Sequence, residues 1–253
     1  MKIKIISSGS KANCTLISCG STNLLIDAGP TSRFIVTEIE KENISPNEID
    51  GVIITHTHSD HIKGLKVFIK NSNAKVYITE ELLPEIIKIV PASNIKLIDN
   101  IFNLNDIYIE LLNMSHDVPC HGIIMKYNEK ELIYITDTGY VNKKYFSKLY
   151  NKDFYIIETN YNEKMLMEGP YPYTLKQRIL SDSGHMSNKY AGSLLAKCIG
   201  PKTKYVFLAH ISEHNNEKEL VLKEVKEELK DIEFDLNNLI LTDQYTASEM
   251  VEI

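Results

Sequence analysis

The stretch His56-Thr57-His58-Ser59-Asp60-His61 constrains this chain most, because it places four side chains able to bind metal within six residues. This hexapeptide follows Asp50–Thr55, an apolar run rich in β-branched residues that predicts a buried strand. Helical spacing begins directly after it, at Ile62–Ile69. We therefore expect the hexapeptide on a strand-to-helix turn, with its first two histidines on one metal ion and its Asp-His pair on a second.

Metal-binding side chains also follow three later strands. The pairs of predicted strand and following side chain are Ile107–Leu112 with His116, Glu131–Thr136 with Asp137, and Lys204–Leu208 with His210. We expect His116 to complete the imidazole set of the first metal, Asp137 to bridge both ions, and His210 to serve the second. Taken singly, His116 also fits a hydrogen-bonded loop residue and Asp137 an ordinary turn.

One further histidine, His185, precedes a predicted helix at Asn188–Ile199, with Ser187 as its N-cap. Because a helix N-terminus attracts anions, His185 is expected to hold a phosphate or to protonate a leaving oxygen. The alternative is a surface-loop histidine. His121 lies in a Pro-Cys-His-Gly segment and is expected in a loop without a role.

Length and composition indicate one α/β domain over residues 1–253, since 43% hydrophobic content supports a sizeable core and predicted strands alternate with helices. No apolar run approaches the roughly 20 residues needed to span a bilayer, and the N-terminus lacks a signal-peptide pattern. Four cysteines without a C-x-x-C pair fit reduced thiols. We expect a cytoplasmic protein with no membrane partner.

The net charge of -6 argues mildly against a nucleic-acid partner, but the charge is unevenly distributed. Val141–Lys204 holds 11 Lys and Arg against 5 Asp and Glu, a net of +6, which leaves 17 against 29, or -12, elsewhere. The same stretch contains 7 of the 14 tyrosines, a mixture suited to phosphate contacts and base stacking. Composition alone favours the plainer reading of a solvated face with partly buried rings.

The hexapeptide has the form H-x-H-x-D-H, which resembles the signature of the metallo-β-lactamase superfamily. Taken with further segments, the chain is similar to the bacterial YycJ/WalJ family. These segments are Ser7–Cys14, Leu25–Gly29, Ile62–Leu65, Glu158–Asn162, Met165–Leu166, Gly169–Pro172, Leu175–Ile179, Gly184–Asn188 and Leu208–Asn216. The resemblance implies a metallo-β-lactamase fold, a four-layer αβ/βα sandwich related to RNase J and tRNase Z.

The resemblance also implies an activity, that of a metal-dependent 5′-to-3′ DNA exonuclease linked to DNA repair. Seven side chains carry over as ligands of two divalent ions, zinc, manganese or iron: His56, His58, His116, Asp60, His61, Asp137 and His210. Asp60 is expected to be catalytic as well, together with His185 in the position that related nucleases use beside the phosphate. DNA is a more probable partner than RNA on this resemblance, and the oligomeric state is not predicted.

The chain departs from the family pattern at Ala12, where glycine is more usual, and at His214, where an acidic residue is usual. Only 47 residues, 138 to 184, separate Asp137 from His185. The large β-CASP insertion of RNase J does not fit there, and the long arm of tRNase Z has no counterpart. Both absences argue against those RNA-processing activities.

The expected mechanism is attack on the phosphodiester by hydroxide formed on the metal ions. Candidate substrate contacts come from the basic stretch and the family-like segments: Asn160, Tyr171, Lys176, Arg178, Ser187 and Asn188. A small-molecule hydrolase of the lactonase or glyoxalase II type would use the same metal ligands without a basic groove. A non-catalytic regulatory protein is a third reading, against which the complete set of seven ligands counts.

Overall fold

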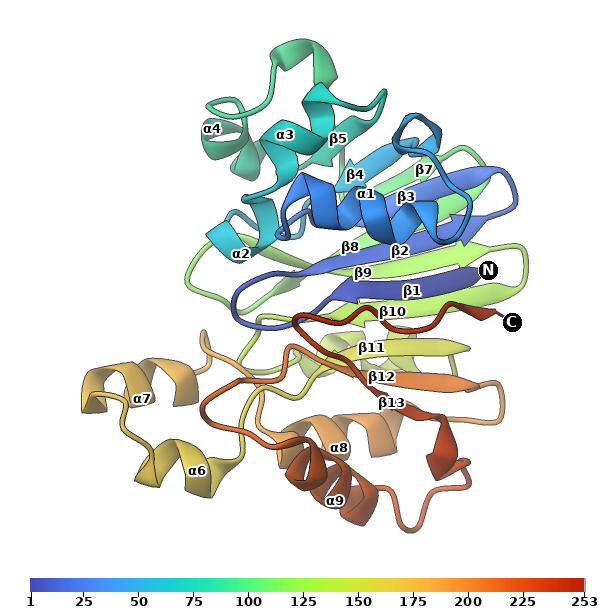
Figure 1. The fold of residues 1–253 in the computed structure, drawn as a ribbon. Coiled ribbons are helices and arrows are strands. Elements are labelled where there is room, and N and C mark those ends of the chain that lie inside the picture. The colour runs from blue at the N-terminus through green and yellow to red at the C-terminus, as the bar shows by residue number, and fades with distance from the viewer. Residues whose placement is uncertain (253) are drawn as a thin grey trace. The chain divides into compact units, whose positions relative to one another are not determined.

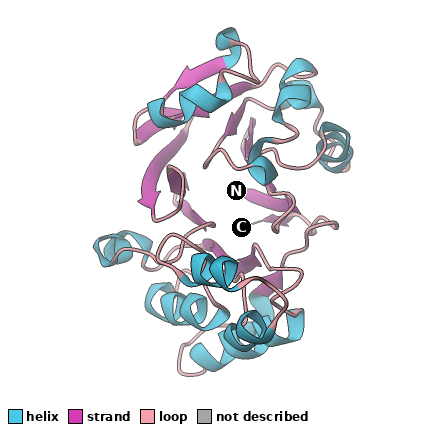
Figure 2. Ribbon diagram, turned by 90° about the vertical axis from the view of Figure 1, so that its left-hand side faces the viewer, coloured by secondary structure: helices cyan, strands magenta, loops and turns pink. Residues whose placement is uncertain are grey.

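A computed structural model describes residues 1–252, which form two compact units. The first unit is Met1–Leu111 together with the segment that begins at Asp243, and the second is Leu112–Thr242. The strands make two seven-stranded sheets, in the orders β14-β1-β2-β3-β4-β5-β6 and β13-β12-β11-β10-β9-β8-β7 (Figure 1). Both units combine strands with helices (Figure 2). No helix among the described residues is long and apolar enough to cross a membrane.

The sheet of the first unit begins antiparallel and continues parallel. Its strands are β1 (Lys2–Ser7), β2 (Cys14–Cys19), β3 (Thr22–Ile26), β4 (Gly51–Ile53), β5 (Lys75–Ile78), β6 (Ile95–Leu97) and β14 (Val251–Glu252). Because β3 and β4 are parallel and pair Ile26 with Ile53, the residues that follow both strands emerge at one edge of the sheet. That edge carries the hexapeptide.

The helices of the first unit are short: α1 (Ser32–Glu40), α2 (Ser59–Ile62), α3 (Leu65–Lys70) and α4 (Leu83–Ile86). Thr31 caps α1, since its Oγ1 accepts the backbone N–H of Phe34 at 3.3 Å. The single helix expected after the hexapeptide is wrong, because the chain breaks into α2 and α3 at Gly64. A Cβ there would lie 1.8 Å from the carbonyl oxygen of Pro30, so only glycine fits this close approach.

The second sheet is antiparallel from β7 to β8 and from β9 to β10, and parallel from β10 to β13. Its strands are β7 (Ile101–Leu104), β8 (Ile107–Met114), β9 (Cys120–Tyr127), β10 (Lys130–Ile135), β11 (Phe154–Glu158), β12 (Tyr205–Ala209) and β13 (Leu239–Leu241). The parallel register pairs Ile135 with Ile157 and Glu158 with Ala209. The ends of β10, β11 and β12 therefore meet at one edge.

The second unit has five helices, α5 (Phe146–Leu149), α6 (Glu163–Glu168), α7 (Tyr173–Leu180), α8 (Asn188–Cys198) and α9 (Lys218–Glu228). The predicted cap of α8 is confirmed, since Ser187 Oγ accepts the backbone N–H of Tyr190 at 3.2 Å. Leu194 and Leu195 of α8 and Val221 and Val225 of α9 are buried in one hydrophobic cluster with the sheet. This cluster holds α8 against the sheet.

The prediction that His121 lies in a loop is wrong. The residue lies in β9, and its side chain is buried. Antiparallel pairing of Met125 with Leu132 and of Ile123 with Tyr134 extends the ladder toward this end of β9. Local turn chemistry suggested a loop, but the backbone hydrogen bonds of the sheet decided the conformation.

Candidate metal-ligating side chains in each unit

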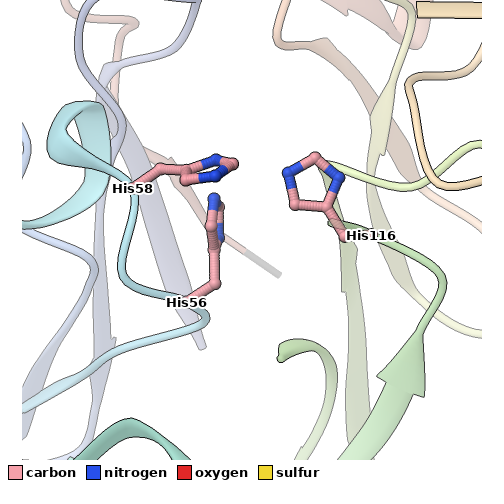
Figure 3. A group of neighbouring side chains, drawn as sticks. All are labelled: His56, His58 and His116. Carbon is pink, nitrogen blue, oxygen red and sulfur yellow. The ribbon is translucent and has the colours of Figure 1, made fainter. Parts of the chain in front are cut away.

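In the first unit the hexapeptide leaves β4 and turns into α2, as the spacing predicted. His58 occupies the N-cap position of α2, and Asp60 and His61 lie in the helix itself. The ring of His56 lies 4.8 Å from that of His58 and 4.0 Å from that of His61, centroid to centroid. Figure 3 shows the rings of His56 and His58 next to each other. The structure thus brings these three imidazoles together, with His56 and His61 fully buried.

A carboxylate that the sequence analysis left without a role, Asp27, holds this cluster in place. It is fully buried and adopts a positive φ of 60°, a conformation that a non-glycine residue keeps only when its surroundings enforce it. Its Oδ1 accepts the backbone N–H of Thr55 at 2.9 Å, and its Oδ2 lies 2.7 Å from His61 Nδ1. Such a contact places the imidazole hydrogen on Nδ1, so that Nε2 is the nitrogen of His61 suited to coordination.

Burial raises the pKa of the Asp27 carboxyl above its ordinary value. The charge of His61, and the hydrogen bonds that His61 and Thr55 make with this carboxylate, offset part of that rise in pKa. In the sequence Asp27 could be noticed only as the first residue of an Asp-Ala-Gly segment at a strand end. Its role was not visible there, because its partner His61 lies 34 residues away.

Asp60 is oriented by Asn13, which the sequence analysis also passed over. The side-chain amide of Asn13 lies 3.1 Å from Asp60 Oδ2 and 2.9 Å from His61 Nε2. Two hydrogen bonds with Gly9 fix that amide, and the backbone N–H of Asn13 donates to the carbonyl oxygen of Asp60 at 2.8 Å. Gly29 completes the contact, since a Cβ there would lie 1.6 Å from the same carbonyl oxygen.

In the second unit, four side chains converge at the ends of neighbouring strands: Asp137 after β10, Glu158 at the end of β11, His210 after β12, and His185 from the loop before α8. Their ligand atoms all lie within 4.8 Å of one another. Asp137 and His210 have positive φ values of 57° and 54°, which marks both as conformationally constrained.

Glu158 organises this group, although the sequence analysis assigned it no function. It is fully buried, and its Oε1 lies 2.7 Å from Nδ1 of His185 and 2.7 Å from Nδ1 of His210. Its Oε2 accepts the backbone N–H groups of Thr138 at 3.2 Å and Met186 at 3.1 Å. One carboxylate therefore fixes both imidazoles with hydrogen on Nδ1 and with Nε2 directed away from it.

Burial would raise the pKa of Glu158, but the charges and hydrogen bonds of His185 and His210 outweigh it and leave that pKa below its ordinary value. His116, which follows β8 and is also drawn in Figure 3, has a pKa lowered mainly by burial, against the opposing charge of Asp137. A neutral imidazole is the form that binds metal, so burial favours the ligating state of His116.

Three predicted substrate contacts lie inside the protein. Asn160 donates to the carbonyl oxygen of His210 at 2.9 Å, and Asn188 donates to Glu224 at 3.0 Å, while Ser187 caps α8. All three residues are buried, which suits support of the site, and their contact with a substrate stays a prediction.

The other three predicted contacts lie on or near α7. Arg178 forms an ion pair of 2.7 Å with Asp117, the residue after His116. Lys176 Nζ donates to the carbonyl oxygen of Met167 at 2.7 Å, and the ring of Tyr171 lies edge-on to that of His214 at 6.1 Å between centroids.

Comparison with known proteins places these features in a family. The model of the β-lactamase superfamily domain matches residues 22–211, a span that contains all seven predicted ligands. The chain is 32% identical to the exodeoxyribonuclease YycJ of Bacillus anthracis over 237 residues, which covers 91% of this chain and 90% of that protein. The chain belongs to the YycJ/WalJ family. It is also 34% identical to the exodeoxyribonuclease WalJ of Streptococcus pneumoniae, over 87% of this chain and 84% of the relative.

Solved structures support the fold of this YycJ/WalJ member. The protein YhfI of Bacillus subtilis matches with a TM-score of 0.74 at 18% identity over 98% of both chains. The short form of human tRNase Z matches with a TM-score of 0.67 at 16% identity, over 98% of this chain and 99% of that one. The predicted metallo-β-lactamase fold is confirmed, and this YycJ/WalJ protein is a metal-dependent hydrolase with histidine and aspartate clusters compatible with divalent ions.

Proposed function

We propose that this protein is a 5′-to-3′ DNA exonuclease that acts in DNA repair. Its relatives over about nine tenths of the chain are named exodeoxyribonucleases. The observation that carries the proposal is the carboxylate-linked group His185–Glu158–His210, because it fixes a proton-carrying imidazole beside a predicted metal ligand. Phosphodiester cleavage needs both a metal-assisted nucleophile and a proton for the leaving oxygen.

The proposed metal centre uses all seven predicted ligands. His56, His58 and His116 would hold one ion, Asp60, His61 and His210 the other, and Asp137 both. The donor set fits: carboxylates hold His61 and His210 with hydrogen on Nδ1, and burial favours neutral His116. A set of histidines and carboxylates accepts zinc, manganese or iron.

Two bound ions would lower the pKa of a water nucleophile and neutralise charge on the phosphoryl group. The protein supplies orientation and protons. His185 suits the role of proton donor, because its side chain is 19% exposed while that of His210 is 2% exposed. Glu158 holds the Nδ1 hydrogen of His185, so the doubly protonated ring would give the proton on Nε2 to the leaving oxygen. Asp60, 18% exposed and fixed by Asn13, would orient the attacking water.

The proposed DNA-binding surface is the basic stretch Val141–Lys204, whose net charge of +6 contrasts with -12 elsewhere. Lys176 and Arg178 would contact phosphates there. Replacing both with alanine should weaken binding of DNA and reduce the dependence of its Kd on salt, without loss of metal. An unchanged salt dependence would contradict this assignment.

The proposed activity is tested on end-labelled double-stranded DNA, single-stranded DNA and RNA. Metal-stripped protein is resupplied with manganese or zinc, with Asp60→Ala as the inactive control. Stepwise loss of nucleotides from the 5′ end of DNA, absent in the variant, is the expected result. Turnover of a lactone or thioester without cleavage of any polynucleotide would instead establish a small-molecule hydrolase.

Two further measurements test the metal count and the cellular role. Elemental analysis of the purified protein is expected to give two divalent ions per chain, and one ion would contradict the dinuclear centre. Cells without the protein should show an increased mutation frequency after DNA damage. Wild-type protein, and not Asp60→Ala, should restore the normal frequency.

A further inference from the structure

Helices α6 and α7 present an unusual surface. They extend from the second unit as an arm beside α8 (Figure 1). Met167, Tyr173 and Leu180 are exposed to 50%, 69% and 38%. The neighbouring buried cluster is small: Tyr161, Leu166 and Ile179, with Tyr171 and Leu175 partly buried against it. The arm thus exposes three of the nine large hydrophobic side chains that are exposed among the described residues.

One face of α7 carries the exposed side chains of Tyr173, Gln177 and Leu180 and the partly buried side chain of Lys176. Tyr173 begins the helix, and Lys176, Gln177 and Leu180 follow at spacings of three, four and seven residues. Ile179, on another face, is buried in the small cluster. The outward face thus offers an aromatic ring with a lysine one turn away, within the stretch that carries a net charge of +6.

The other end of α7 is fixed to the loop that carries His185. The backbone N–H of His185 donates to the carbonyl oxygen of Ile179 at 3.0 Å. The loop packs so closely that a Cβ at Gly184 would lie 2.2 Å from the same oxygen. Because an α-helix rises about 1.5 Å per residue, the six residues from Tyr173 to Ile179 separate Tyr173 from this attachment by about 9 Å.

We propose that Tyr173 is a base-stacking platform for single-stranded DNA whose phosphate is held at His185. This inference rests on the proposed function. At about 3.4 Å per stacked nucleotide, this distance spans about three nucleotide steps. The ring is exposed enough for a base to lie on it, and stacking tolerates every base because each has a π-face. Strands of four or more nucleotides would reach Tyr173, and dinucleotides would not.

The test measures binding of fluorescent oligothymidylates of 12 and 2 nucleotides by anisotropy, in the non-cleaving Asp60→Ala background. Tyr173→Ala is expected to weaken binding of the 12-mer about 5- to 150-fold and to leave the dinucleotide unaffected. Tyr173→Trp should retain binding. Tyr245→Ala is the matched control, because Tyr245 is 60% exposed and lies in the first unit.

The outcomes separate this inference from the proposed function. If wild-type protein degrades DNA but Tyr173→Ala binds the 12-mer within twofold of its parent, the platform is refuted and the exonuclease stands. Equal losses for the 12-mer and the dinucleotide would also refute it, because the ring would then act at the phosphate. A change in sedimentation without a change in DNA binding would assign the face to a second copy of the chain. If wild-type protein cleaves no polynucleotide, the proposed function itself fails.

Discussion

Replacing Glu158 tests directly whether this carboxylate positions His185 and His210. Its two oxygens accept four hydrogen bonds, from two imidazoles and two backbone N–H groups. Glutamine keeps the shape but has one acceptor oxygen, so in Glu158→Gln its NH₂ group must face two of the four donors. Each lost hydrogen bond to a charged group is worth about 1.5–3 kcal/mol, so the two lost bonds should lower the free energy of unfolding by about 3–6 kcal/mol.

The imidazoles have one way to relieve this loss, and it harms the metal site. If the NH₂ group faces His185 and His210, each ring can accept at Nδ1 only by moving its hydrogen to Nε2, the nitrogen suited to coordination. We therefore also expect metal affinity to fall about 10- to 100-fold, as is usual when the partner of a ligating histidine is removed.

The assay has two parts. Urea denaturation of metal-stripped protein gives the free energy of unfolding, and competition with a chromophoric chelator gives the zinc affinity. Glu168→Gln, at the exposed end of α6, is the matched control and should change neither quantity. If Glu158→Gln changes stability by less than about 0.5 kcal/mol and leaves zinc affinity intact, Glu158 does not position these histidines.

Three further predictions concern other contacts. Asn13→Asp puts a negative charge beside the carboxylate of Asp60, which the Asn13 amide contacts at 3.1 Å. In a nuclease assay kcat should therefore fall more than tenfold while KM changes little. A kcat equal to that of the wild-type protein would contradict the positioning role. Burial raises the pKa of Cys19 to about 11 and that of Cys198 to about 12. A thiol reagent at pH 8 should therefore modify neither cysteine until the protein unfolds. Fast modification of the native protein would refute this prediction. Burial would raise the pKa of Glu38, but hydrogen bonds from two lysines, Lys4 among them, lower it below 4.5. Its stabilising contribution is therefore full above pH 4.5 and is lost as pH falls through the lowered pKa. Urea denaturation should show Glu38→Gln destabilised by about 1–3 kcal/mol at pH 7, with a deficit that shrinks progressively as the pH is lowered below 4.5; a deficit independent of pH would contradict this.

Sequence alone determined the features whose interactions are local. The hexapeptide had to lie between a strand and a helix, because a buried β-branched run precedes it and helical spacing follows. Ser187 was recognisable as an N-cap, since a cap accepts a hydrogen bond from a backbone N–H only three residues ahead. The segments that resemble the YycJ/WalJ family likewise predicted the metallo-β-lactamase fold.

Tertiary structure decided which side chains support the candidate ligands. Asn13 meets Asp60 across 47 residues, Asp27 meets His61 across 34, and Glu158 meets His210 across 52. The local pattern of these residues does not reveal these roles, because each acts through a hydrogen bond to a residue far away in the sequence. Parallel pairing of β11 with β12 places Glu158 beside His210, and the loop before α8 brings His185 to the same carboxylate, so contacts between distant segments make this glutamate the group that holds two histidines.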